Sequence, residues 1–261
     1  NILLSGYITP TSKIIYDHTI ADVVRKTAPY LQLDHDPYLV IVNGNLYWIW
    51  DAYTTSSNFP YATPVNGVNY MRNSVKIVID AYNGNATFYR MDTPDHPDPI
   101  IDAYSRLFPT LYRPVSEMPA EFRAHLRYPE DLFQAQARLF SLYHMTDPQV
   151  FYNREDAWNL PTESQAGSQF QLDPYYVILR LPGASSPEFL LMEPFVPQAK
   201  MNMVAWLAAR SDPDRYGQLL AYTFSKDSLI FGPQQIESRI DQDTEVSADL
   251  TLWNQQGSKV V

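Results

Sequence analysis

The stretch that decides the fold is residues 74–89, SVKIVIDAYNGNATFY. Its first half alternates β-branched apolar residues with a mixed set, a period of two that is typical of a half-buried strand. The Asn83-Gly84 pair that follows favours a type I′ turn, because both residue types accept positive φ at little cost. A second run of strand-forming residues begins at Ala86. The stretch therefore predicts a β-hairpin.

Residues 38–53 repeat this plan around Asn43-Gly44. An isolated hairpin is only marginally stable in water. We therefore expect the two hairpins to share one sheet that packs against helices.

The rest of the chain alternates between strand pairs and clusters of helices. Helices are predicted over residues 19–31, 99–108, 117–126, 129–144, 201–210, 233–239 and 245–253, with a short one after Asp147-Pro148. Further strands are predicted over residues 175–181, 189–195 and 219–224, with a polar loop at 158–171 and a lead-in at 1–17 that holds one strand at most. This arrangement indicates an α+β fold with mainly antiparallel pairing. We expect one domain over residues 1–261, with its weakest seam near 158–173.

Composition excludes several classes of protein. The chain has 261 residues and a net charge of -10, which disfavours binding to nucleic acid or to anionic lipid. It has no cysteine, so disulfides and thiolate metal sites are excluded. It also lacks the run of about 18 apolar residues that a membrane-spanning helix needs.

Two clusters combine acidic residues with a histidine, and such groups can hold a divalent cation when several oxygens converge. Their members are Asp92, Asp95, His96 and Asp98 in one cluster, and Asp34, His35 and Asp36 in the other. Neither cluster has the regular spacing of a calcium-binding loop, and aspartate before proline is commonly a turn or a helix cap. We therefore expect no cofactor, with a divalent cation as the alternative.

Catalytic candidates are few. His125 could act as a general base beside Glu130 or Asp131, although a histidine near a helix end is more often a cap or a packed residue. His144 lies at a predicted helix C-terminus, where a cation interacts well with the helix dipole. The nucleophile elbow, the phosphate-binding loop, the dinucleotide fingerprint and the zinc-protease motif are all missing from the sequence.

Five aromatic residues gather around the first hairpin and the loop after it: Trp48, Trp50, Tyr53, Phe59 and Tyr61. Two of them, Trp48 and Trp50, lie on the same face of their strand by the period of two. An exposed aromatic face could hold a glycan or a peptide, whereas a buried one is core, which is the commoner case.

Several blocks of the chain resemble a known family. They are residues 34–38 (DHDPY), 48–55 (WIWDAYTT), 70–76 (YMRNSVK), 80–84 (DAYNG) and 125–133 (HLRYPEDLF). Together they are similar to the uncharacterised multi-spanning membrane proteins of actinobacteria and cyanobacteria. In that family a bundle of transmembrane helices precedes a large extracytoplasmic domain. The resemblance implies that this chain is a soluble fragment of that domain, on the outer side of the plasma membrane and beside its own transmembrane region. It implies no catalytic residues.

A shorter resemblance covers residues 78–85, VIDAYNGN, which are similar to a strand-turn-strand element of small extracytoplasmic domains in protease propeptides.

Three hypotheses for the function follow from the sequence as a whole. The first is a non-catalytic module that binds a partner, a peptide or an envelope polymer. The second is an envelope-directed hydrolase with carboxylates in a cleft, and the third is a structural cap over a transporter-like bundle. We favour the first.

Overall fold

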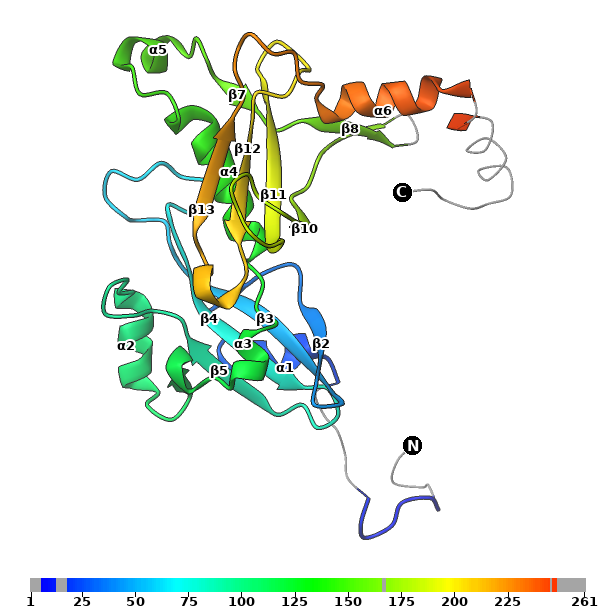
Figure 1. The fold of residues 1–261 in the computed structure, drawn as a ribbon. Helices are drawn as coiled ribbons and strands as arrows, with labels where there is room; N and C mark the ends of the chain where they lie inside the picture. Colours follow the sequence, from blue (N-terminus) through cyan, green and yellow to red (C-terminus); the bar gives the residue numbers. More distant parts are fainter. Residues whose placement is uncertain (1–5, 13–17, 166–167, 245, 248–261) are drawn as a thin grey trace. The chain divides into compact units, whose positions relative to one another are not determined.

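The computed structural model describes residues 6–12, 18–165, 168–244 and 246–247 (Figure 1). Contacts along the chain divide it into two compact units, Asn1–Pro119 and Ala120–Val261. The predicted seam at residues 158–173 lies inside the second unit. A single domain over residues 1–261 stays a prediction.

The first unit is built on a six-stranded sheet of order β1-β3-β4-β5-β6, with β2 also paired to β3. The strands are β1 (Gln32–Leu33), β2 (Tyr38–Val42), β3 (Asn45–Ser56), β4 (Tyr70–Asp80), β5 (Ala86–Arg90) and β6 (Tyr112–Pro114). Only the β5–β6 pair is parallel among the described pairs of this sheet. The predicted α+β class with mainly antiparallel pairing is confirmed.

Two helices of the first unit share a core with one face of this sheet. Helix α1 (Ile20–Thr27) is capped by Thr19, whose side chain accepts from the Asp22 N–H, and helix α2 (Pro99–Leu107) is capped by Asp98. Proline at the first helical position and an acidic cap both favour a helix start, as the sequence predicts. The buried core joins both helices to the central strands through Val24, Ile101, Trp50, Ala52, Val75, Ile77, Ile79 and Phe88.

The two Asn-Gly pairs form different turns. Asn43 and Gly44 both have positive φ, at 50° and 78°, as a type I′ turn requires. At the second pair only Gly84 has positive φ, and the prediction of a type I′ turn there is wrong. The Asp80 carboxylate accepts from the backbone N–H groups of Tyr82 and Asn83, so a side-chain-stabilised turn of residues 81–85 replaces the two-residue one.

The second unit contains a five-stranded sheet of order β10-β11-β12-β13, in which β7 pairs with the far end of β11. Its strands are β7 (Trp158–Asn159), β10 (Tyr175–Leu179), β11 (Glu188–Pro197), β12 (Ala205–Arg210) and β13 (Leu219–Thr223). A separate hairpin joins β8 (Thr162–Gln165) to β9 (Ser168–Gln171). The helical segments are α3 (Ala120–Arg123), α4 (Glu130–Tyr143), α5 (Pro148–Asn153), η3 (Pro213–Arg215) and α6 (Pro233–Gln242).

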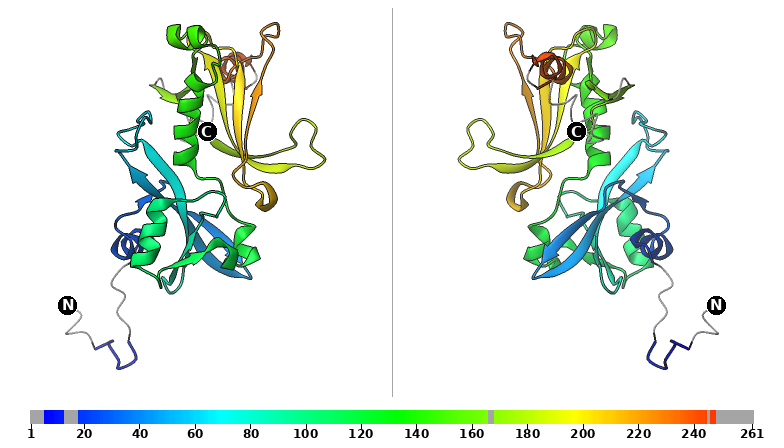
Figure 2. Two further views of the ribbon diagram at one scale, coloured as in Figure 1. Left: turned by 90° about the vertical axis from the view of Figure 1, so that its left-hand side faces the viewer. Right: turned by 90° about the vertical axis from the view of Figure 1, so that its right-hand side faces the viewer.

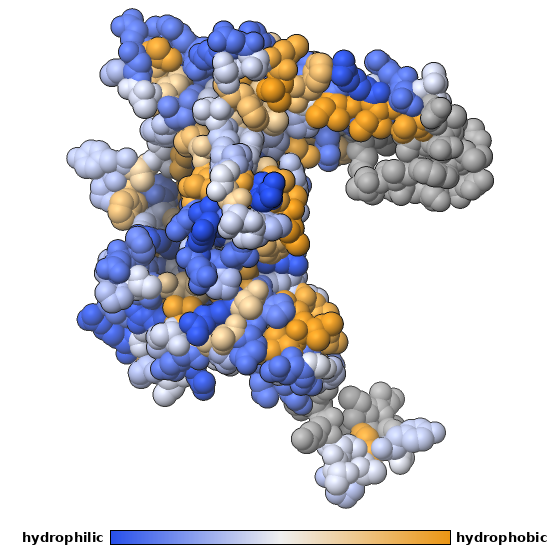
Figure 3. Space-filling view, viewed as in Figure 1, coloured by the Kyte–Doolittle hydropathy of each residue, from blue (hydrophilic) through white to orange (hydrophobic). Residues whose placement is uncertain are grey.

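Helix α4 lies along one face of the five-stranded sheet (Figure 2). Phe133 and Ala137 of α4 pack there against Leu191, Phe195 and Leu207 of the sheet. Helix α6 carries apolar residues along one side (Figure 3), and its residues Ile236 and Ile240 are exposed.

Three predicted segments are wrong. The helix predicted at 201–210 is replaced at Ala205–Arg210 by strand β12, because pairing with β11 and β13 overrides the helix propensity of alanine. Residues 158–171 hold three short strands instead of a loop. Residues 117–126 hold only α3 after the 3-10 turn η2 (Val115–Glu117), because Pro119 keeps Met118 extended, with ψ at 127°. Most of the helix expected at 245–253 lies outside the described residues.

A buried ion pair crosses the two longest strands of the first unit. Lys76 of β4 and Asp51 of β3 are direct cross-strand neighbours, their charged groups are in contact, and both side chains are almost completely buried. Asn73 donates a further hydrogen bond of 2.8 Å to Asp51. Burial raises the pKa of Asp51, and the Lys76 ammonium opposes that shift. The alternation in residues 74–80 predicts Lys76 on a mixed face, and the structure buries both faces.

We expect Lys76→Met to lower the free energy of unfolding by about 3–5 kcal/mol, because it leaves the Asp51 charge buried without its partner. Adding Asp51→Asn should recover part of that loss, since the double variant has no buried charge at this pair. Urea unfolding followed by tryptophan fluorescence measures both. Lys200→Met, at an exposed lysine, is the matched control. Equal losses for Lys76→Met and the control would contradict the expectation.

Candidate binding site

The loop between β3 and β4, residues 57–69, is held in a defined conformation by the Asn69 side chain. The Phe59 N–H donates to Asn69 Oδ1 over 2.9 Å, and Asn69 Nδ2 donates to the Phe59 carbonyl over 2.8 Å. Further along the loop, Val65 and Val68 exchange two backbone hydrogen bonds across a tight turn. These internal bonds give the loop an ordered shape.

Two of the predicted aromatic residues are displayed on this loop. Tyr61 is fully exposed, and its φ of 59° lies in the left-handed region that is uncommon for non-glycine residues. Such a conformation costs on the order of 1–3 kcal/mol and tends to occur at functional sites. Phe59 is 49% exposed and stacks on Tyr70, with ring centroids 5.2 Å apart. The loop therefore presents an aromatic surface on an ordered backbone.

The other three predicted aromatic residues belong to the sheet. Trp50 and Tyr53 are buried, and both bind Asp34: the Trp50 indole N–H donates to the Asp34 carbonyl over 2.7 Å, and the Tyr53 hydroxyl donates to its carboxylate. Trp48 is partly buried and packs against the core of the first unit. The structure therefore joins Phe59 and Tyr61 on one loop and places Trp50 and Tyr53 in the core.

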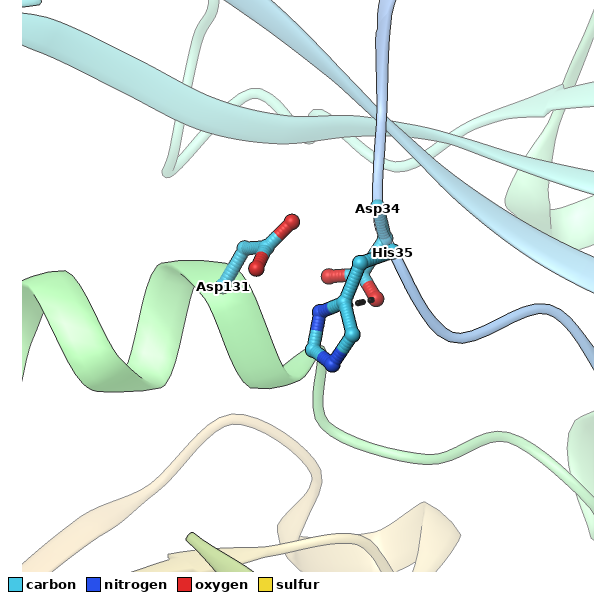
Figure 4. Close-up of side chains that lie close together, drawn as sticks. All are labelled: Asp34, His35 and Asp131. Atoms are coloured by element: carbon cyan, nitrogen blue, oxygen red, sulfur yellow. Dashed lines mark ion pairs between the residues drawn. The ribbon is translucent and has the colours of Figure 1, made fainter. Parts of the chain in front are cut away.

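The predicted cluster at residues 34–36 is organised around the buried Asp34 carboxylate. Figure 4 shows the ion pair between Asp34 and the largely exposed His35, with His35 Nδ1 3.8 Å from Asp34 Oδ1. The same Oδ1 accepts from the Asp36 N–H over 2.9 Å, while the Tyr53 hydroxyl donates to Oδ2. Asp131, also labelled in Figure 4, belongs to the second unit, in the first turn of α4. Through these contacts, Asp34 bonds the β1–β2 connection to strand β3.

The second predicted cation cluster is divided among separate roles. Asp92 pairs with Arg90 over 2.5 Å, and this hydrogen bond raises the pKa of Arg90. Asp95 and His96 are exposed in a turn, where His96 and Thr93 bond through their backbones. Within the described part of the chain, no three of the four predicted ligands bring their ligand atoms within 4.8 Å of one another. The divalent cation stays a prediction.

Asp98 is the most heavily hydrogen-bonded member of that cluster. Thr54 Oγ1 donates over 2.7 Å, Tyr70 Oη over 2.9 Å, and Ser74 Oγ also donates, in addition to the N–H groups of α2. Burial alone would raise the pKa of Asp98, but the hydroxyl donors outweigh it and hold the pKa below its ordinary value. Asp98 thereby ties α2 to strands β3 and β4, and its oxygens are occupied by protein donors.

The histidines predicted as catalytic or capping residues lie in the second unit. His125 is exposed, and its Nδ1 is 2.7 Å from the Glu121 carbonyl oxygen. His144 is the C-cap of α4, and its ring stacks on Trp158 with centroids 3.5 Å apart. Its two ring nitrogens each face a carbonyl oxygen, Phe140 at 3.0 Å and Asp156 at 3.1 Å. Ring stacking and the two carbonyl contacts therefore hold His144 at the end of α4.

Sequence reasoning missed the buried polar groups Asp51, Ser74 and Lys76 and the half-buried Asn73 beside them. A lysine and an aspartate among β-branched strand residues were the available signal. Their pairing depends on the register of β3 against β4, which shifts between Ala52 and Tyr53.

Fold and site together define an α+β protein of mainly antiparallel sheets with an ordered aromatic loop. The chain belongs to the Uncharacterised protein family (UPF0182), whose family model matches residues 1–253.

Relatives of similar identity come from several organisms. A UPF0182 protein of Pelotomaculum thermopropionicum is 51% identical over 261 residues, covering 100% of this chain and 28% of the relative. One from Bradyrhizobium diazoefficiens is 53% identical over 263 residues, again covering 100% and 28%. One from Synechococcus is 49% identical over 267 residues, covering 99% and 31%. The chain thus spans about 28% of the length of the first curated relatives it matches. No solved structure matches.

The resemblance to an uncharacterised family is confirmed, and the membrane topology that it implies stays a prediction. Among the helices of the described residues, none is long and apolar enough to cross a membrane.

We expect Asp98→Asn to lower the free energy of unfolding by about 1–3 kcal/mol at neutral pH, because neutral asparagine replaces charge-assisted bonds. A carboxyl group with a depressed folded pKa stabilises above its unfolded pKa of about 3.9, and that stabilisation is lost as pH falls through the folded value. The difference between wild type and variant should therefore shrink below about pH 4. Unfolding curves at pH 7, 5, 4 and 3 measure it.

The control for this experiment is Asp95→Asn, which removes an exposed carboxylate from the same segment. It should change stability by no more than about 0.5 kcal/mol. A constant gap between wild type and Asp98→Asn down to pH 3 would show that the charge of Asp98 contributes nothing.

Proposed function

We propose that this chain is a non-catalytic extracytoplasmic module of a multi-spanning membrane protein, and that it binds a partner, a peptide or an envelope polymer. The observation that carries the binding role is the 57–69 loop, which displays Tyr61 in a left-handed conformation on a backbone fixed by Asn69. The extracytoplasmic setting rests on the family resemblance alone.

A rigid aromatic surface suits such ligands for a physical reason. A tyrosine ring offers a flat apolar face and a polar hydroxyl, so it can contact a sugar ring or a peptide with little loss of side-chain entropy. The loop backbone is already ordered by the Asn69 bonds, so binding needs less ordering of the chain. Phe59, stacked on Tyr70 beside the same Asn69 clamp, extends the aromatic area.

The hydrolase alternative needs two carboxylates that face a cleft. Asp34, Asp51 and Asp98 are all buried. Their oxygens are engaged by Tyr53, Lys76 and Ser74, among other donors. These three carboxylates therefore stabilise the fold by bonding its strands, a helix and a connection to one another. This structural role favours binding over hydrolysis for this part of the chain.

We expect Tyr61→Ala to weaken capture of ligand at least tenfold while leaving the unfolding midpoint unchanged, because the side chain is fully exposed. Calorimetric titration with soluble peptidoglycan fragments, and a peptide array, are the two measurements. Tyr152→Ala is the control, since Tyr152 is a highly exposed tyrosine on α5. If a probe binds wild type and Tyr61→Ala equally, the loop is not the site.

Trp50→Ala should behave differently from Tyr61→Ala. It removes a buried indole that packs in the core and donates to the Asp34 carbonyl. We expect a loss of about 3–5 kcal/mol in the free energy of unfolding. Thermal unfolding of the two variants side by side separates a core role from a surface role. If Tyr61→Ala also melts early, Tyr61 stabilises the fold instead of forming a binding surface.

A further inference from the structure

Glu193 lies in the middle of β11, inside the core of the second unit. Its side chain is 0% exposed. It projects to the same side of the strand as Leu191 and Phe195, which pack in the core beneath α4, and its cross-strand neighbour on β12 is Leu207. An acidic residue therefore occupies a position that the surrounding sequence fills with apolar side chains.

The Glu193 carboxyl group lacks a hydrogen-bond donor in the part of the chain that the structure describes. Neither Oε1 nor Oε2 has a partner among the described residues. Burying an ionised carboxylate without donors is very costly in free energy, and such a group takes up a proton instead. The geometry of the site therefore favours the neutral acid.

The charged groups around Glu193 come from two elements. Asp173, just before β10, repels a negative charge there, whereas Arg138 of α4 attracts it. Gln134, one turn before Arg138, donates to Asp173 over 3.4 Å. The phenol of Tyr175 on β10 also interacts with Glu193. Burial raises the pKa of Glu193 to about 8, Asp173 adds to the shift, and Arg138 opposes it.

We propose that Glu193 is a buried proton-binding site that makes the packing of α4 on the β10–β13 sheet depend on pH. With a proton bound, the side chain is neutral and the apolar layer between Phe133, Leu191 and Phe195 closes over it. Loss of the proton leaves a negative charge in that layer next to Asp173. The charge is relieved only by moving toward Arg138 or by admitting water, and either change loosens α4.

The direction of the effect on stability follows from linkage. A carboxyl group whose folded pKa is raised contributes fully below its unfolded pKa of about 4.3. That contribution declines as pH rises, and above a folded pKa of about 8 no more is lost. Glu193 therefore destabilises the second unit as pH rises from about 4.3 to about 8, which is the opposite of the loss at Asp98 as pH falls.

The test follows the 261-residue chain by infrared spectroscopy and thermal unfolding between pH 5 and pH 9.5. Wild type should show the carbonyl band of a protonated carboxyl group that disappears with a midpoint near pH 8 and is absent from Glu193→Gln. The melting temperature of wild type should fall between pH 5 and about pH 8 and then level off, and that of Glu193→Gln should stay flatter. Glu121→Gln, at an exposed glutamate, is the control and should match wild type.

Two neighbouring variants make the test independent of whether Glu193→Gln folds. Asp173→Asn removes the repulsion and should move the midpoint to lower pH, whereas Arg138→Gln removes the attraction and should move it to higher pH. Opposite shifts support the proposal. Absence of the protonated band at pH 6 in wild type, or an unmoved midpoint in both variants, overturns it.

Discussion

The buried contact between Lys76 and Asp51 is the constraint on which the first unit depends. Two opposite charges inside a sheet can be accommodated only if β3 and β4 pair in the one register that brings them together, because a slip by one residue would separate them. That register also sets Trp50 opposite Ile77 and Trp48 opposite Ile79. The ion pair thus specifies the alignment of the apolar core, although its net contribution to stability is expected to be small beside that of the core.

Three buried acids show how the surroundings decide what a carboxyl group does. Asp51 faces an ammonium group, Asp98 faces hydroxyl and backbone donors, and Glu193 faces no donor among the described residues. The pKa of Asp98 is consequently lowered, whereas the pKa of Glu193 is raised. Burial is common to all three, so the difference lies in the donors that each fold element supplies. The contributions of Asp98 and Glu193 to stability therefore change with pH in opposite directions.

The surroundings also decide which aromatic residues near β3 are buried and which are exposed. Sequence periodicity puts Trp48 and Trp50 on one face, and the structure agrees, but periodicity cannot tell whether that face meets solvent or helices. Helices α1 and α2 cover it, so Trp50 is core. Tyr61 lies beyond the strand, where no periodicity applies, and its exposure depends on the loop that Asn69 holds together. The exposed aromatic surface is therefore a property of the loop rather than of the strand.

The sequence by itself determined the α+β class, the hairpin at Asn43-Gly44, the Asp98 cap of α2 and the family. The first three rest on local turn chemistry, capping and short-range periodicity, which act between neighbours in the chain, whereas the family rests on the blocks of sequence that resemble it. Only the tertiary structure decided that residues 205–210 pair as a central strand, that Lys76 meets Asp51, and that Glu193 is buried without a donor. Each of these depends on segments far apart in the sequence, whose register and packing no local pattern encodes.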